Sequence, residues 1–218
     1  FYQCIKSLKK NKISKSWLTK QHGDYFVRQS KIQGYRSRSA FKLIEINEKF
    51  NFLKKSTFLL DLGSSPGGWS QVARKIITKG KILAVDIIPM KNIDNVKFLE
   101  GDLENYGTCD KIHSYFNTKI DVVISDMSVN TSGNKSLDSY KNGVLCLKSM
   151  DLARKILHED GVFLSKFFMG SIFTEINNEA KNCFKKIHNY KPQASRKESN
   201  EIYIYCKGIS KSFNFPKV

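Results

Sequence analysis

Three carboxylates in this sequence stand at or just beyond the ends of short apolar runs, where they could serve a ligand. They are Asp86, Asp102 and Asp126. A carboxylate at such a position can accept hydrogen bonds from both ribose hydroxyls of a nucleoside, and we assign this role to Asp86. A second carboxylate can accept a hydrogen bond from an adenine amino group, and we assign this role to Asp102. One such residue alone is more often a helix cap, but three in succession indicate a nucleoside-containing cofactor.

A glycine-rich segment, Asp61–Trp69 (DLGSSPGGW), lies between an apolar run and a helical pattern. Glycines allow the backbone to approach a ligand closely. The spacing differs from the G-x-G-x-x-G pattern of dinucleotide sites, and Pro66 removes one amide that a pyrophosphate would use. On the residues alone, a dinucleotide and S-adenosylmethionine remain alternatives.

Two lysines and two carboxylates are expected near one edge of the folded chain. Lys166 ends an apolar run, where burying an ammonium group is costly unless it is paired. Glu201 opens the last apolar run, and Lys42 lies one turn into a predicted amphipathic helix. With Asp126 they form a set that could align an acceptor hydroxyl and manage its proton. The alternative is that Lys166 is an edge lysine whose ammonium group reaches solvent.

The elements that must position these residues alternate along the chain. From residue 57 onward, apolar runs alternate with helix-like spacing, which predicts parallel crossovers and an open α/β sheet. The polar stretch 134–141 is predicted to be a loop because it is rich in turn-forming residues. Strands are expected at 57–62, 82–86, 96–99, 121–125, 161–165 and 201–206, and helices at 37–52, 69–77, 140–157 and 173–184.

The net charge of +17 over 218 residues is unevenly distributed. Residues 1–55 contain 14 Lys and Arg against 3 Asp and Glu, net +11, and residues 181–218 contain 9 against 2, net +7. The middle of the chain has a net charge of −1. Basic ends around a nearly neutral domain favour nucleic acid as a polyanionic partner, and the alternatives are a solvated tail or a membrane-surface patch.

The cysteines and histidines show no metal-ligand spacing, so we expect no metal and no disulfide framework. No apolar run approaches the roughly 20 residues that span a bilayer, so we expect no membrane partner. The five cysteines are scattered, which favours reduced thiols in an intracellular compartment.

Four segments together carry a resemblance to a known family. They are Gly34–Leu43 (GYRSRSAFKL), Asp61–Gln71 (DLGSSPGGWSQ), Ser125–Met127 (SDM) and Ser195–Glu201 (SRKESNE). From about Ser30 to Lys207 the chain resembles the FtsJ/RrmJ-type 2′-O-ribose RNA methyltransferases. The resemblance implies a Rossmann-like methyltransferase fold, with a mostly parallel sheet and helices on both faces, and S-adenosylmethionine as the cofactor.

The resemblance also implies roles for individual residues. It implies a catalytic tetrad of Lys42, Asp126, Lys166 and Glu201, in which Lys166 acts as the base or as an electrostatic stabiliser. The implied cofactor-binding residues are Gly63, Pro66, Gly67, Gly68, Trp69, Asp86, Asp102 and Asp126. For contacts with RNA we expect Arg36, Arg38, Arg196 and Lys197.

The leading hypothesis is 2′-O-methylation of a uridine ribose in large-subunit ribosomal RNA, free or in the ribosomal subunit. The alternatives are a tRNA 2′-O-methyltransferase, an NAD-dependent dehydrogenase and a non-catalytic RNA-binding module on a methyltransferase fold. We expect a basic extension at 1–29, one methyltransferase domain at 30–210 and a tail at 211–218. We also expect a monomer. Lys191–Ser199 resembles the organellar members, which favours a mitochondrion or another organelle over the nucleolus or cytoplasm.

Overall fold

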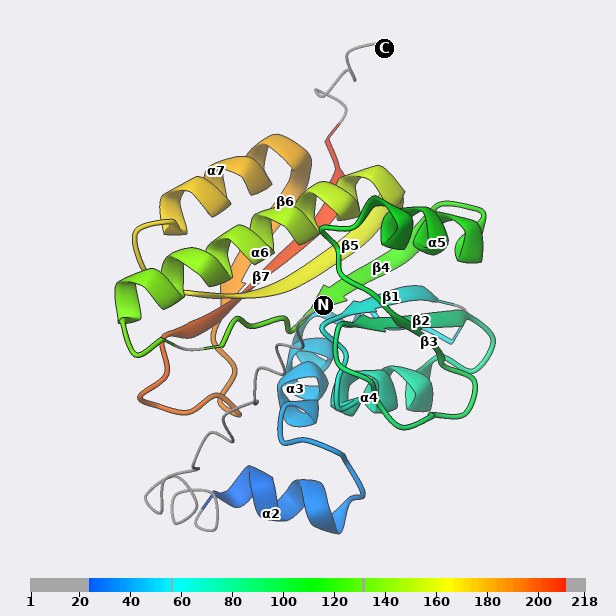
Figure 1. Ribbon diagram of the computed structural model, residues 1–218, viewed down its shortest axis with the longest axis horizontal. Coiled ribbons are helices and arrows are strands. Elements are labelled where there is room, and N and C mark those ends of the chain that lie inside the picture. The colour runs from blue at the N-terminus through cyan, green and yellow to red at the C-terminus, as the bar shows by residue number, and fades with distance from the viewer. Residues whose placement is uncertain (1–23, 56, 131, 211–218) are drawn as a thin grey trace, which may run out of the picture.

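A single seven-stranded sheet organises the chain, as the computed structural model in Figure 1 shows for residues 24–55, 57–130 and 132–210. The strand order is β3-β2-β1-β4-β5-β7-β6. The first five strands pair in parallel, and β7 runs antiparallel to both β5 and β6. The predicted mostly parallel α/β sheet is therefore confirmed. The strands are β1 (Phe58–Leu62), β2 (Lys81–Asp86), β3 (Lys97–Glu100), β4 (Ile120–Ser125), β5 (Leu157–Phe168), β6 (Phe184–Tyr190) and β7 (Glu201–Ile209).

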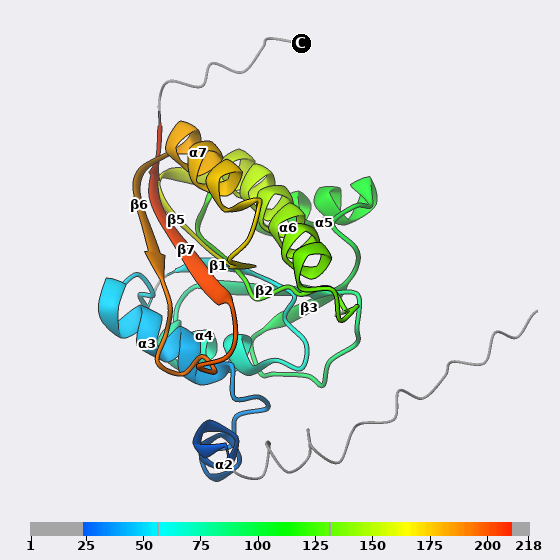
Figure 2. The ribbon, with the colours of Figure 1, turned by 90° about the vertical axis from the view of Figure 1, so that its left-hand side faces the viewer.

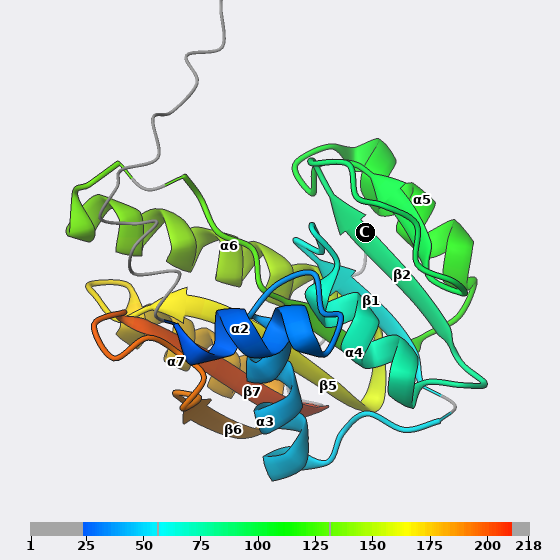
Figure 3. The same ribbon diagram turned by 90° about the horizontal axis from the view of Figure 1, so that it is seen from below.

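Helices cover both faces of the sheet, as Figures 1 and 2 show. One face carries α5, α6 and α7, and the opposite face carries α3 and α4, with α2 outside them (Figure 3). The helices are α2 (Tyr25–Ile32), α3 (Ala40–Phe50), α4 (Gly68–Ile76), α5 (Tyr106–Phe116), α6 (Lys135–Ile156) and α7 (Phe173–Cys183). None of these helices has the length and apolarity needed to cross a membrane.

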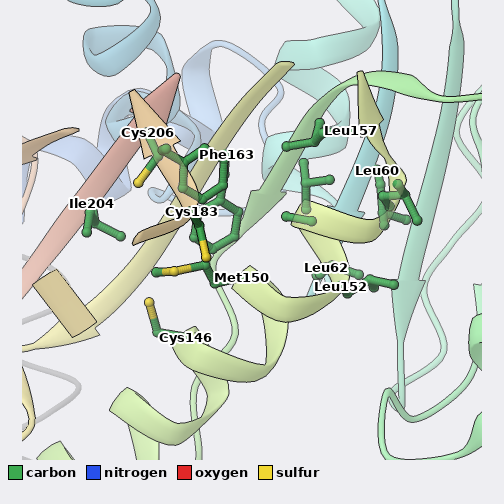
Figure 4. Close-up of a cluster of buried hydrophobic side chains, with 14 of the residues drawn as sticks. Leu60, Leu62, Cys146, Met150, Leu152, Leu157, Phe163, Cys183, Ile204 and Cys206 are labelled. Carbon is green, nitrogen blue, oxygen red and sulfur yellow. The ribbon is translucent and has the colours of Figure 1, made fainter. Parts of the chain in front are cut away.

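Each face of the sheet has its own hydrophobic core. The core under α5, α6 and α7 consists of aliphatic, aromatic and sulfur-containing side chains (Figure 4). Phe163 of β5 is fully buried there, and its ring stacks on Phe184 with centroids 5.9 Å apart. The core under α3 and α4 includes Trp69, Leu43 and Tyr203. Burial on both faces supplies most of the driving force for folding.

Three elements of the structure were not predicted: helix α2, helix α5 and strand β6. Strand β6 follows α7 without a break and contains exposed Lys185 and Lys186, so its apolar residues do not alternate with period two. Lysines are common on edge strands because they discourage pairing with other chains. Helix α5 buries Ile112 and Phe116, but its remaining residues are mostly polar and mask the helical pattern.

The prediction of a loop at 134–141 was wrong, because α6 begins at Lys135. The Asn134 side chain accepts hydrogen bonds from the backbone amides of Ser136 and Leu137, which makes it the N-cap of the helix. Asparagine favours caps and turns alike, and here the cap satisfies amides that have no partner within the helix.

Helix α2 crosses the boundary expected at residues 29 and 30. Asp24 caps α2 and forms an ion pair with Arg38, and the ring of Phe26 lies 5.4 Å from that of Phe41 in α3. These contacts join α2 to the sheet domain. Residues 1–23 of the expected extension and the expected tail at 211–218 lie outside the described residues.

Candidate active site

Ionisable side chains occupy one face of the sheet at the carboxyl ends of its parallel strands. Side chains two residues apart on a strand point to the same face. Asp61, Asp86 and Asp126 each lie two residues beyond an apolar residue of the core under α3 and α4. The alternation of the strands therefore brings three carboxyl groups to the same edge of this face.

Lys166 of β5 and Glu201 of β7 belong to the same face. Lys166 lies two residues beyond buried Leu164, and Glu201 lies two residues before buried Tyr203. In the antiparallel register Lys166 pairs with Tyr203, and Glu201 pairs with Phe168. Because β7 runs antiparallel, its first residue reaches the edge where the parallel strands end.

Lys166 and Asp126 form the first of two buried ion pairs. The ammonium Nζ of Lys166 lies 3.0 Å from Asp126 Oδ1 and donates to the backbone oxygen of Asp126 at 2.7 Å. Burial alone would raise the pKa of Asp126. The ammonium groups of Lys166 and Lys42 outweigh burial, so the pKa of Asp126 lies below its ordinary value. The carboxylate is therefore ionised at neutral pH.

Lys42 and Glu201 form the second pair. Helix α3 brings Lys42 to the sheet, where its Nζ lies 2.7 Å from Oε1 of Glu201 and 2.8 Å from Oε2. Both residues are at most 9% exposed. Buried charges of this kind are retained only when they are paired. The structure thus gathers the four predicted tetrad residues into two ion pairs.

Tyr203 connects the two pairs and was missed by the sequence reasoning. Its hydroxyl donates to Asp126 Oδ1 at 2.8 Å, and the centre of its ring lies 5.8 Å from Lys42 Nζ. Burial raises the pKa of Tyr203 well above its ordinary value, and the carboxylates of Asp126 and Glu201 raise it further. The phenol therefore remains a donor. The sequence could have indicated this role, because Tyr203 lies two residues after Glu201 and so on the same face of the predicted last strand.

The glycine-rich loop turns sharply between β1 and α4. Gly63 and Gly67 have φ values of 73° and 112°, which lie in the left-handed region that favours glycine. Trp69 is 2% exposed, and its indole nitrogen donates to Ser39 O at 2.9 Å. The Trp69 side chain thus belongs to the core under α3 and α4.

The structure places Asp86 beside this loop and Asp102 further out. Asp86 Oδ2 accepts from the amide of Ser65 at 2.9 Å, and Oδ1 accepts from the amide of Ile88 at 2.8 Å. Asp102 is exposed and accepts from the amide of Glu104 at 2.9 Å. A carboxylate has about four acceptor positions, so Asp86 and Asp102 can each accept further hydrogen bonds.

Asp61 is the most deeply buried carboxyl group of the site. Its side chain is fully buried, and Ser70 of α4 donates to its Oδ2 at 2.6 Å. Its Oδ1 is buried without a hydrogen-bond partner among the described residues. Burial, together with the charges of Asp126 and Asp86, raises the pKa of Asp61 to about 7, although the hydrogen bond from Ser70 lowers it.

The four residues predicted to bind RNA lie in different surroundings. The guanidinium of Arg36 donates to the backbone oxygens of Lys91 and Asn92 at 2.6 and 2.7 Å. These hydrogen bonds stabilise the loop that follows β2. Lys197 is exposed. Arg38 and Arg196 line a hollow of about 330 Å³ beside the second ion pair, together with Lys42, Glu198, Ser199 and Glu201.

The described residues contain no group of three or more His, Cys, Asp and Glu side chains that could hold a metal ion. The site itself presents paired ammonium and carboxylate groups beside a glycine-rich loop. Such a site can bind a nucleoside, orient a hydroxyl group and stabilise charge that develops on oxygen.

Comparisons with known proteins agree with this geometry. The sequence profile of a family described as FtsJ-like methyltransferase matches residues 35–209. Ribosomal RNA large subunit methyltransferase E of Pelagibacter ubique is 44% identical over 200 residues, which cover 92% of this chain and 98% of that protein. The protein of the same name from Acinetobacter baylyi is 38% identical over 210 residues, covering 95% and 97%.

Solved structures extend the comparison to the fold. A Plasmodium falciparum protein described as a ribosomal RNA methyltransferase superimposes with a TM-score of 0.72 at 32% identity, over 80% of this chain and 98% of that chain. The fibrillarin pre-rRNA processing protein of Methanococcus jannaschii superimposes with a TM-score of 0.53 at 16% identity, over 73% and 70%, and so shares the fold alone. The expected Rossmann-like fold is confirmed.

Proposed function

The chain belongs to the FtsJ-like methyltransferase family, and from this membership we propose that it methylates a ribose 2′-oxygen of ribosomal RNA with S-adenosylmethionine as the donor. The observation that carries the proposal is the pair of buried ion pairs at the carboxyl edge of the sheet. Relatives that share 38–44% identity with the chain are named for methylation of large-subunit ribosomal RNA.

The residues beside the glycine-rich loop suit S-adenosylmethionine, which carries a transferable methyl group on a cationic sulfur. Asp86 would accept from the ribose hydroxyls, and Asp102 would accept from the adenine amino group. Ile87 and Ile88 are 64% and 60% exposed directly after Asp86, which provides an apolar surface for an aromatic base. Buried Asp61, with one oxygen unpartnered, supports a cationic ligand over a neutral one.

Lys166 would stabilise negative charge on the acceptor oxygen. Its ammonium group is held by the carboxylate and the backbone oxygen of Asp126, at 3.0 and 2.7 Å, in charge-assisted contacts that fix its position. This arrangement supports electrostatic stabilisation over the alternative in which Lys166 removes the proton. Lys42, held by Glu201, would position the acceptor ribose, and Gly63, Pro66, Gly67, Gly68 and the backbone of Trp69 would border the cofactor.

The substrate would approach through the basic parts of the molecule. Arg38 and Arg196 line the hollow beside Lys42, where a phosphodiester next to the acceptor ribose would find two guanidinium groups. Contacts with phosphates release bound counterions, so RNA affinity should fall steeply as salt increases. An RNA affinity that is insensitive to salt would contradict this role of the basic residues.

The test is single-turnover methylation of large-subunit ribosomal RNA, free and in the assembled subunit, against tRNA. The labelled nucleotide is then mapped to its ribose or its base. We expect a single ribose label, on a uridine, in large-subunit RNA, and labelling slower by about 10² or more with Lys166→Ala. Labelling of tRNA alone would contradict the proposed substrate, and labelling of a base would contradict the proposed chemistry.

A further inference from the structure

Asp61 differs from Asp126 and Glu201, the other buried carboxyl groups of the site, because no ammonium group among the described residues forms an ion pair with it. It is fully buried, and its hydrogen bonds come from Ser70, through the hydroxyl that donates to Oδ2 at 2.6 Å and through the backbone amide. Its second oxygen is a buried acceptor with no partner among the described residues. Burying an unpaired carboxylate costs far more than burying a carboxylic acid, so Asp61 is close to changing its protonation state.

The charged groups around Asp61 come from every element packed against it. Asp86 of β2 and Asp126 beyond β4 lie on the flanking strands, and both carboxylates oppose its ionisation. Lys166 and Tyr203 are bonded to Asp126, and α4 contributes the neutral hydroxyl of Ser70. The remaining charged pair of the site is Lys42 with Glu201. No histidine is among these neighbours.

We propose that Asp61 senses the charge of the methyl donor: it is ionised while the site holds the sulfonium donor and protonated while the site is empty or holds the neutral thioether product. This rests on the proposed use of S-adenosylmethionine. On donor binding Asp61 loses a proton to solvent, and it regains one from solvent once the methyl group has left and the sulfur is neutral. Asp61 therefore favours the donor over the product and promotes exchange of one for the other.

The distances within the site allow this coupling. With the pKa of free Asp61 at about 7, a tenfold rise in its acid dissociation constant in the donor complex would tighten donor binding about fivefold between pH 6 and pH 8. A tenfold change equals about 1.4 kcal/mol. Two opposite unit charges reach that energy at up to about 12 Å with an effective dielectric constant of about 20. Asp126 lies one strand away and two residues further along, roughly 8 Å from Asp61 at strand spacing.

The experiment is isothermal titration calorimetry of the whole chain with S-adenosylmethionine and with S-adenosylhomocysteine at pH 6, 7 and 8. Each titration is repeated in two buffers of different ionisation enthalpy to count protons. The ligands' own α-amino groups titrate nearby, at about 7.7–8.0. The informative quantity is therefore the difference between the wild type and Asp61→Asn. We expect a difference of about half a proton released at pH 7 with the donor, and none with the product.

Two further variants separate coupling from a structural effect. Ser70→Ala removes the hydrogen bond that lowers the pKa of Asp61, so the rise in donor affinity should move to higher pH. Asp151→Asn, on the exposed side of α6, should behave as the wild type. Equal proton counts in the wild type and Asp61→Asn would overturn the proposal, as would equal pH dependence for donor and product. If neither ligand binds the wild type at any pH, the proposed cofactor itself is wrong.

Discussion

The two faces of the sheet have the same strands beneath them and differ in what they bury. The face under α5, α6 and α7 has a core of aliphatic, aromatic and sulfur-containing side chains. The face under α3 and α4 is apolar along most of each strand and becomes ionisable over its last residues, at Asp61, Asp126 and Lys166. Lys166 and Asp126 are buried there as an ion pair, whereas the carboxyl group of Asp61 is hydrogen-bonded to Ser70. The first face thus mainly stabilises the molecule, whereas the buried ionisable groups of the second face lower its stability and provide its chemistry.

The largest effect on the apolar face is expected from Phe163→Ala. Phe163 is fully buried and stacked on Phe184, so its removal leaves a cavity and costs about 3–5 kcal/mol of unfolding free energy. Urea denaturation measures the loss. Tyr106→Ala, at a side chain that is 88% exposed, is the control and should change stability by no more than about 0.5 kcal/mol. A loss below about 1 kcal/mol for Phe163→Ala would mean that this face stabilises less than its burial indicates.

The second prediction concerns the ionisable face. Lys166→Ala should lower turnover by about 10² or more, because it removes the charge that we propose stabilises the acceptor oxygen. Affinity for S-adenosylmethionine should remain largely intact. Lys148→Ala removes an exposed lysine that pairs with Glu104 on the other face, and its turnover should be unchanged. Methylation near the normal rate by Lys166→Ala would remove the basis for assigning catalysis to this face.

Tyr203→Phe tests how the ionisable face holds Asp126. The substitution keeps the aromatic ring and removes the hydroxyl that bonds Asp126, so the pKa of Asp126 should rise towards its ordinary value. Because a group with a lowered folded-state pKa stabilises above its unfolded pKa and loses that contribution as pH falls, acid unfolding should begin at higher pH. Turnover should fall up to about tenfold, with the acid limb of its pH profile shifted upward.

Tyr205→Phe is the matched control for this variant. Tyr205 lies two residues further along the same strand, where its ring stacks on Phe50 with centroids 4.1 Å apart. Its substitution should leave the pH profile unchanged. If Tyr203→Phe and Tyr205→Phe shift the profile equally, the effect comes from packing, and the bond to Asp126 has no special part.

Sequence patterns could predict the parallel part of the sheet because each of its strands is recognisable from its own residues. β1, β2 and β4 are apolar runs with an acidic residue at or beyond the end, and parallel strands present those ends together. The edge that holds the site follows from this. An element was predictable where the pattern of apolar residues within its own segment reveals which residues are buried. Helix α5 is half polar and strand β6 lies at the edge of the sheet, so neither has such a pattern.

The internal pairing of the site depends on contacts between distant segments. Lys166 meets Tyr203 because β7 inserts between β5 and β6 in an antiparallel register, which no local pattern specifies. Lys42 meets Glu201 because α3 crosses to the same edge. Strand-end positions and the resemblance to a family singled out the four residues of the predicted tetrad. Only the structure shows which lysine pairs with which carboxylate and that Tyr203 lies between the pairs.

The smallest expected effect is at the N-cap of α6, on the apolar face. Asn134→Ala removes the acceptor for the amides of Ser136 and Leu137 and should cost about 1 kcal/mol of unfolding free energy, measured by urea denaturation. Turnover should not change if the apolar face stabilises the molecule independently of the site. However, Asn142 of α6 contacts Ser128 in the loop that follows Asp126, with 3.1 Å between Oγ and Oδ1. A fall in turnover larger than the loss of folded protein would therefore show that α6 also positions the site, and that the two faces act together.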